Sequence, residues 1–294
     1  MTDFITSPDP QWLDRMYNNR ALVPDHAVCL NRLAALSSEA RQQLPGHLDL
    51  RYGDAPGERL DIFPASGTVQ NKKGAPVLLM VHGGYWRAMD KSDHSYIAPS
   101  FTQAGACVVV VNYDLLPAVS VQQIMMQVVK SVAWVYRNAS RFGGDPDRIT
   151  VVGHSVGGYM AAMLLGCAWK TYAADLPATL VKNAMAISGL YDLQPLTNTP
   201  FIREAIGLSD REAKSISPAF FPAPRKASLY AVAGADESAE FLRQNLLIQK
   251  AWGEKVVPVC ESHLGLNHFT VLDSLAEPSH RMHRLVLDLL GKTA

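Results

Sequence analysis

The sequence predicts an α/β fold in which a mostly parallel central sheet has helices on both faces and carries a small cap. Continuous apolar runs, typical of strands buried on both faces, occur at residues 76–81 and 107–112. An amphipathic, helix-like stretch follows at 121–139. Because strands that alternate with helices favour a parallel sheet, we expect the carboxyl ends of the strands to meet at one edge, where such folds bind ligands.

The domain organisation follows from length and composition. The 294 residues are consistent with a single domain, 1–294, because α/β folds often reach this size undivided. We expect an N-terminal helical segment at 1–47 that packs on the body and over the mouth of the site. The stretch at about 190–222 is irregular and contains several prolines, so we expect it to form the small cap.

Composition excludes several classes of partner. Basic and acidic residues each number 27, so no basic face is indicated and nucleic acid is a poor candidate partner. No apolar run is long enough to span a bilayer, and residues 1–12 lack the pattern of a signal peptide. The four cysteines are scattered, which predicts a cytoplasmic protein with reduced thiols and no zinc site. We expect a small-molecule substrate and no metal or organic cofactor, and a homodimer is left open.

The remaining elements alternate along the chain. Further strands are expected at 48–52, 59–63, 149–152, 181–187, 228–233 and 255–260. Further helices are expected at 25–44, 96–104, 158–165, 237–252 and 279–291. His280 and His283, in the last of these helices, are expected to face solvent.

Residues 153–157 form the pattern G-x-S-x-G between a β-branched run and a helix-like run. A serine at the tip of a sharp strand-to-helix turn is strained, and Gly153 and Gly157 leave room around it. The turn lifts the Ser155 hydroxyl clear of the sheet. It also places the N–H of Val156 at the start of a helix, where a developing oxyanion is stabilised. Ser155 is therefore the candidate nucleophile.

A serine hydroxyl needs a base within hydrogen-bond reach, and the best base is a histidine oriented by a carboxylate. His268, in the sequence GLNHF, follows the last expected strand and is the candidate base, with His263 as the alternative. Asp236, in the sequence GADES, follows an earlier strand and is the candidate acid. Glu237 and Glu240 are the alternatives for the acid. The chain order serine, acid, histidine is the one found on this architecture.

The pattern HGGYW at 82–86 follows a buried strand upstream of the candidate nucleophile. Successive glycines let backbone N–H groups turn toward a substrate oxygen without a clash. Gly83 and Gly84, with the N–H of Tyr85, are therefore candidates for the second half of an oxyanion hole. His82 is expected to tie this loop to neighbouring backbone, and His154 is also expected to be structural.

With these motifs in place, the chain resembles the α/β-hydrolases. Within them, HGGYW resembles the H-G-G-x-W mark of the kynurenine formamidase (arylformamidase) family, which related bacterial esterases share. The sequences NYDLLP at 112–117 and ISGLYDL at 187–193 agree, and the resemblance spans about 17–268. It implies a serine hydrolase that cleaves N-formylkynurenine to kynurenine and formate. A carboxylesterase for short-chain or aryl esters is the first alternative, and a ligand-binding homologue without turnover is the second.

Substrate contacts are expected from side chains near the candidate nucleophile. Trp86 and Tyr159 are candidates to line the pocket, although large aromatic residues beside glycine-rich loops are as often part of the core. The amino-acid end of N-formylkynurenine would need a polar or charged partner at the rim. Arg87, Asp192 and Arg203 are the candidates, and the sequence does not choose between them.

Overall fold

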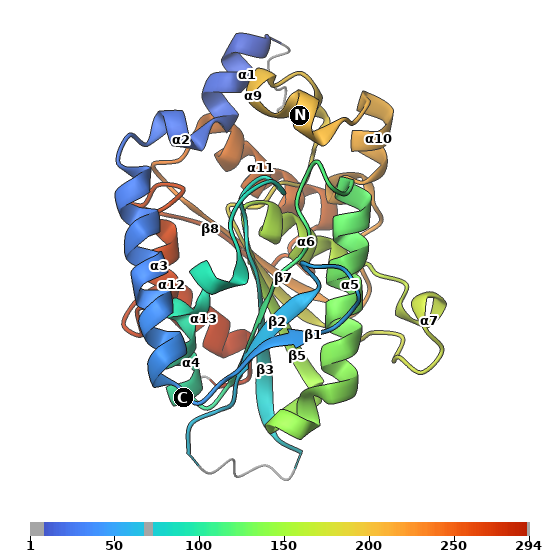
Figure 1. The fold of residues 1–294 in the computed structure, drawn as a ribbon. Coiled ribbons are helices and arrows are strands. Elements are labelled where there is room, and N and C mark those ends of the chain that lie inside the picture. Colours follow the sequence, from blue (N-terminus) through green and yellow to red (C-terminus); the bar gives the residue numbers. More distant parts are fainter. Residues whose placement is uncertain (1–8, 68–72, 293–294) are drawn as a thin grey trace.

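The computed structural model describes residues 9–67 and 73–292, so residues 1–8 of the expected N-terminal segment lie outside the described residues. Eight strands form one sheet in the order β1-β2-β4-β3-β5-β6-β7-β8 (Figure 1). The bounds are β1 (His47–Arg51), β2 (Arg59–Phe63), β3 (Ala75–Val81), β4 (Cys107–Val111), β5 (Gly144–His154), β6 (Asn183–Ile187), β7 (Ser228–Gly234) and β8 (Val259–His263). Only the pairs β1–β2 and β2–β4 are antiparallel. The expected mostly parallel sheet is therefore confirmed.

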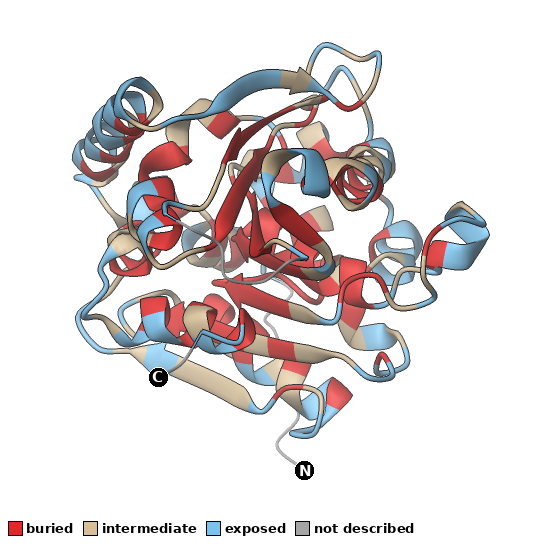
Figure 2. Cartoon of the chain, turned by 90° about the horizontal axis from the view of Figure 1, so that it is seen from below, coloured by how far each residue is buried: buried red, intermediate tan, exposed pale blue. Residues whose placement is uncertain are grey.

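The central strands are apolar on both faces because a separate core covers each face. In β3, Leu79 and Val81 belong to one core, and Leu78 and Met80 belong to the other, as the two-residue period of a strand requires. Every residue of β3 and β4 is buried. Figure 2 shows this burial as red strands between helices whose inner faces are red and whose outer faces are pale blue.

Helices supply the two covering layers. The first layer contains α5 (Val121–Asn138), α6 (Val156–Leu165) and α11 (Ala239–Trp252), and the second contains α3 (His26–Gln43), α4 (Ala98–Gln103), α12 (Val271–Ala276) and α13 (Arg281–Leu289). The shorter helices are α1 (Pro10–Tyr17), α2 (Asn19–Leu22), α7 (Trp169–Tyr172), α8 (Gln194–Thr197), α9 (Pro200–Ile206) and α10 (Asp210–Ser215), with 3-10 turns η1 (Lys91–Asp93), η2 (Ser95–Ile97), η3 (Ala139–Phe142) and η4 (Pro218–Phe220). No helix among the described residues is both long enough and apolar enough to cross a membrane.

The N-terminal helices and the short helices of residues 190–222 lie together at one end of the molecule. Figure 1 places α1, α9 and α10 at this end, and α1 packs against both α8 and α9. The N–H of Phe201 donates a hydrogen bond of 2.9 Å to the Asp14 carboxylate, which joins α9 to α1. This end lies beyond the carboxyl ends of the parallel strands, which is where the candidate site residues were expected.

Three expectations near the C-terminus are wrong in detail. The helix expected from residue 237 begins at Ala239, because the Ser238 hydroxyl caps it by accepting the N–H of Phe241. The last strand is not at 255–260 but at β8, because a turn at Gly253 occupies the preceding residues. His283 does not face solvent: it is buried, and its ring stacks on Phe101 with a centroid separation of 4.2 Å.

Candidate active site

Ser155 occupies a sharp turn between β5 and α6. Its backbone angles are φ 56° and ψ −120°, a strained conformation for a residue with a side chain. Two hydrogen bonds hold the turn: the N–H of Ser155 donates to the Ile187 carbonyl over 2.8 Å, and the N–H of Tyr159 donates to the Ser155 carbonyl over 3.1 Å. A Cβ atom on Gly157 would lie 2.1 Å from the Val81 carbonyl oxygen, so only glycine fits there. The strand, turn and helix expected around Ser155 are all present.

The loop 82–86 lies directly beside this turn. A Cβ atom on Gly83 would lie 3.2 Å from the Cβ of Ser155 and 3.0 Å from the His154 carbonyl oxygen. The backbone then passes through three consecutive positive φ angles, at Gly84 (98°), Tyr85 (51°) and Trp86 (57°). The structure therefore brings the candidate oxyanion loop against His154 and Ser155, directly before Val156, the first residue of α6.

Side-chain contacts of His82 hold the loop 82–86 in place. Its Nδ1 lies 2.9 Å from the Gly83 carbonyl oxygen, and its Nε2 lies 3.1 Å from Oδ1 of Asn112. The Tyr113 ring stacks on the imidazole with a centroid separation of 4.2 Å. Burial lowers the pKa of His82 below its ordinary value, which keeps the ring neutral. These contacts are those of a structural residue, as expected for His82.

The carboxylate that orients His268 belongs to Glu237, which corrects the expectation that Asp236 would do so. Nδ1 of His268 lies 2.6 Å from Oε2 of Glu237, and no part of the Glu237 side chain is exposed. The other oxygen, Oε1, accepts hydrogen bonds from the N–H of Gly234 over 2.7 Å and from the Ser188 hydroxyl over 2.5 Å. Asp236 is exposed, and its N–H donates to the Leu266 carbonyl. The turn after β7 thus points one carboxylate inward and its neighbour outward.

The two alternatives weighed for base and acid lie elsewhere. His263 is the last residue of β8; its ring faces Glu261 and His280 and does not line the cavity described below. The Glu240 carboxylate accepts hydrogen bonds from Tyr17 and Arg243. His268 and Glu237 are therefore the pair that the structure brings to the candidate nucleophile.

His154 packs against His268 without adding charge. The ring centroids are 4.6 Å apart, and Nε2 of His154 lies 2.9 Å from the His268 carbonyl oxygen. A carbonyl only accepts, so Nε2 of His154 carries the proton. Burial lowers the pKa of His154 well below its ordinary value. A neutral ring at this position leaves His268 free of an adjacent positive charge.

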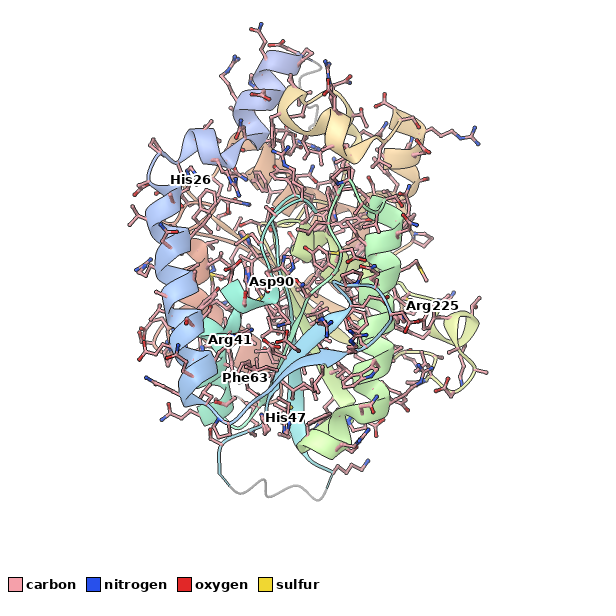
Figure 3. The ribbon with its side chains drawn as sticks, viewed as in Figure 1. His26, Arg41, His47, Phe63, Asp90 and Arg225 are labelled. Atoms are coloured by element: carbon pink, nitrogen blue, oxygen red, sulfur yellow. The ribbon has the colours of Figure 1, made fainter. Side chains whose placement is uncertain are left out.

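Ser155 and His268 line one cavity of about 210 Å³. Its other lining residues come from the N-terminal segment, the loop after β3, α9 and the region of His268: Asn18, Asn19, Arg20, Leu30, Gly84, Tyr85, Arg87, Ala88, Met89, His154, Phe201, Phe269 and Leu272. Asn18, Asn19, Arg20 and Leu30 bring the N-terminal segment to the wall of this cavity. Figure 3 shows His26 at one end of α3 and Arg41 near the other. The His26 ring packs on Phe269 and Arg41 pairs with Asp61, which holds α3 against the body.

Two of the candidate substrate contacts are wrong. Trp86 and Tyr159 do not line the cavity; both are buried, and their rings pack edge to face with centroids 5.6 Å apart. They belong to the core, which was the alternative location. Of the three rim candidates, only Arg87 lines the cavity. Asp192 lies 3.7 Å from Arg243, and Arg203 does not reach the cavity.

Comparison with known proteins agrees with this geometry. The BD-FAE family model matches residues 60–263. The chain belongs to the BD-FAE family. This BD-FAE chain is 28% identical to a kynurenine formamidase of Danio rerio over 90% of its own length and 88% of that protein. It is 32% identical to the esterase LipQ of Mycobacterium tuberculosis, over 51% of its own length and 37% of LipQ.

A solved structure shares nearly the whole fold. It is a protein of Silicibacter sp. TM1040, provisionally assigned as a thioesterase, with a TM-score of 0.80 and 28% identity. The match covers 93% of the BD-FAE chain and 98% of the other protein. The chain therefore has the α/β-hydrolase fold, and it is an enzyme of the α/β-hydrolase type. The resemblance to the kynurenine formamidases and H-G-G-x-W esterases is confirmed.

Proposed function

We propose that the protein is a serine hydrolase that cleaves an aryl formamide, N-formylkynurenine, to kynurenine and formate. The observation that carries the proposal is the shared cavity, which is lined both by a serine on a strained turn and by a histidine that pairs with a glutamate whose side chain is fully buried. The similarity to kynurenine formamidases over 90% of the chain supports the choice of substrate. No step requires a cofactor.

The proposed mechanism assigns one role to each group. Oγ of Ser155 attacks the formyl carbonyl carbon, and His268 accepts the hydroxyl proton while Glu237 holds the ring and stabilises the imidazolium. The N–H groups of Val156 and of the loop at Gly83–Tyr85 stabilise the oxyanion. His268 then protonates the leaving nitrogen, and a water molecule, activated by the same histidine, releases formate from Ser155.

The lining of the cavity suits this substrate. Apolar walls from Phe201, Phe269 and Leu272 provide surfaces on which an aromatic ring can pack. A formyl group is the smallest acyl group, and the close approach of Gly83 to Ser155 leaves little room on the acyl side. An aniline that carries an ortho carbonyl is a comparatively stable leaving amine, so the site needs no machinery beyond its general acid.

A carboxylesterase for short-chain or aryl esters is the second candidate. The partial similarity to the esterase LipQ favours it, and the same serine, histidine and glutamate would perform the reaction. The two candidates differ in the group that leaves, an amine or an alcohol, rather than in the nucleophile.

The test is to assay purified protein side by side on N-formylkynurenine and on short p-nitrophenyl esters. The proposal expects kcat/KM to be higher for N-formylkynurenine, with stoichiometric release of formate. Efficient turnover of the esters with no cleavage of N-formylkynurenine would replace the formamidase assignment with the esterase assignment.

A further inference from the structure

We propose that Asn19 and Arg20 form, with Arg87, a subsite that binds a carboxylate on the substrate's tail and thereby selects anionic substrates. This inference rests on the proposed function and adds to it the residues that recognise the amino-acid end. No motif marks these N-terminal residues in the sequence. They lie far along the chain from Ser155 and reach the cavity only through the fold.

Asn19 supplies the central observation. It is the first residue of α2, it lines the cavity, and only 4% of its surface is exposed. Its amide nitrogen, Nδ2, has no hydrogen-bond partner among the described residues. A buried amide donor without a partner is costly in a folded protein, and one that borders a cavity can be satisfied by what binds there. The missing partner is therefore a hydrogen-bond acceptor on a ligand.

Two arginines that line the cavity favour a negatively charged acceptor. Arg20 and Arg87 both line the cavity and are exposed, one on the N-terminal segment and one on the loop after β3. Nη1 of Arg87 donates to the Phe201 carbonyl over 3.1 Å, and its guanidinium carbon lies 5.5 Å from the centre of the Phe201 ring. No aspartate or glutamate occurs among the described residues that line the cavity. Two cations beside an unpartnered amide favour a carboxylate, which accepts from all three groups.

The subsite is held in a fixed position relative to the reacting groups. The Tyr85 hydroxyl donates to the Tyr17 carbonyl over 2.7 Å, which ties the end of α1, two residues before Asn19, to the oxyanion loop. The Ser238 hydroxyl donates to the Met16 carbonyl over 2.5 Å, which ties α1 to the turn that carries Glu237. Tyr17 is fully buried, and its hydroxyl donates to Glu240 over 2.6 Å. A carboxylate bound at Asn19 would therefore position a substrate against Ser155 at a set distance.

The experiment compares an anionic and a neutral substrate that share one reacting group. N-formylkynurenine carries the carboxylate, and N-formyl-2-aminoacetophenone is the same formanilide without the amino-acid tail. The matching pair of aryl acetates, in which an ester replaces the formamide, is assayed in parallel. The variants are Asn19→Asp, which keeps the size of the side chain but adds a carboxylate, and Arg20→Gln. Arg15→Gln is the control, because Arg15 is exposed on α1 and does not line the cavity.

The decisive quantity is the ratio of kcat/KM for the anionic substrate to that for the neutral one. We expect Asn19→Asp to lower this ratio by about 10- to 100-fold and Arg20→Gln by about 3- to 10-fold, as expected for charge-assisted hydrogen bonds. Arg15→Gln should leave the ratio unchanged. A ratio that stays at the wild-type value in both test variants overturns the subsite, and so does an equal loss on both substrates, which would indicate a structural role.

The two proposals can fail independently. If neither formamide is cleaved but the variants change the ratio for the aryl acetates, the subsite stands and the formamidase assignment fails. If the formamides are cleaved and the ratio does not respond to the variants, the formamidase assignment stands and the subsite fails. Arg20→Gln keeps the test valid if Asn19→Asp does not fold, because Arg20 is exposed.

Discussion

The floor and the mouth of the cavity are built in different ways. The floor consists of the turn at Ser155 and the loop 82–86, where backbone atoms pack so closely that glycines are required. The mouth consists of α2 and the start of α3, and the preceding helix α1 ties this segment to the body through hydrogen bonds. Local backbone geometry therefore positions the candidate reacting groups, whereas tertiary contacts of a distant segment position the proposed carboxylate subsite.

The largest effect is expected at the floor. Ser155→Ala removes the proposed nucleophile while leaving the turn intact, so kcat should fall by about four to six orders of magnitude, as in other enzymes that lose a triad member. The measurement is steady-state turnover of N-formylkynurenine or of an aryl ester, whichever the wild type cleaves. Near wild-type activity in a variant purified free of host hydrolases would show that Ser155 is not the nucleophile.

The next effect separates two neighbouring carboxylates. Glu237→Gln should lower kcat by about three to four orders of magnitude, because an amide cannot stabilise the imidazolium of His268. Asp236→Asn should change kcat by less than about threefold, because Asp236 is exposed and points away. The measurement is kcat of both variants under identical conditions. A larger loss of kcat in Asp236→Asn than in Glu237→Gln would reverse the assignment of the acid.

Acid should destabilise the fold through three buried histidines: His82 and His154 at the floor, and His94, whose ring stacks on His82. Burial lowers the pKa of His82 and His154, and it lowers the pKa of His94 to about 3. All three are neutral in both states above their ordinary value of 6.5. Below it the unfolded chain binds protons that the folded chain does not, so stability falls as the pH drops from about 6.5 toward the folded pKa values. The slope is about 1.4 kcal/mol per pH unit for each histidine.

Urea unfolding between pH 7 and pH 5 measures this slope. His94→Gln removes one titrating group, so its unfolding free energy should depend less steeply on pH than that of the wild type. An unfolding free energy that is constant over this range, or a variant with an unchanged slope, would show that the stability of the fold does not depend on these histidines being neutral.

The smallest effect is expected where floor and mouth meet. Tyr85→Phe removes the hydrogen bond to the Tyr17 carbonyl, which should cost about 1 kcal/mol of unfolding free energy. KM should rise severalfold with kcat nearly unchanged, because the mouth shifts while the floor stays. Tyr230→Phe is the control, since its hydroxyl bonds to Asp288 on the surface. An equal change of KM in both variants would contradict a specific tie between loop and mouth.

The sequence allowed prediction of the parts that depend on local patterns. The alternation of buried strands and helices predicted the mostly parallel sheet, and the G-x-S-x-G pattern predicted the turn at Ser155 because its spacing follows from the steric needs of that turn. His268 was predicted from its place after the last strand. The structure places it in the same cavity as Ser155, although the strand lies a few residues later than expected, because both assignments leave the histidine in the loop beyond the sheet.

The remaining parts depend on contacts between distant residues. Asp236 and Glu237 are adjacent carboxylates, and the choice between them is made by hydrogen bonds from Gly234 and Ser188 that no local pattern reveals. Trp86 points into the core because Tyr159 packs against it from another element. Asn19 could not be predicted as a residue of the proposed subsite, because only the packing of α1 and α2 on the body brings it to the cavity.

Covalent labelling tests the central claim, that Ser155 is a nucleophile activated by His268, most directly. The folded protein is treated with a fluorophosphonate probe, and the site of the adduct is determined by peptide mass spectrometry. We expect one adduct, on Ser155, that forms rapidly in the wild type, slowly in Glu237→Gln and not at all in Ser155→Ala. An unlabelled wild-type protein, or an adduct on another serine that persists in Ser155→Ala, would contradict it and favour a binding protein that lacks turnover.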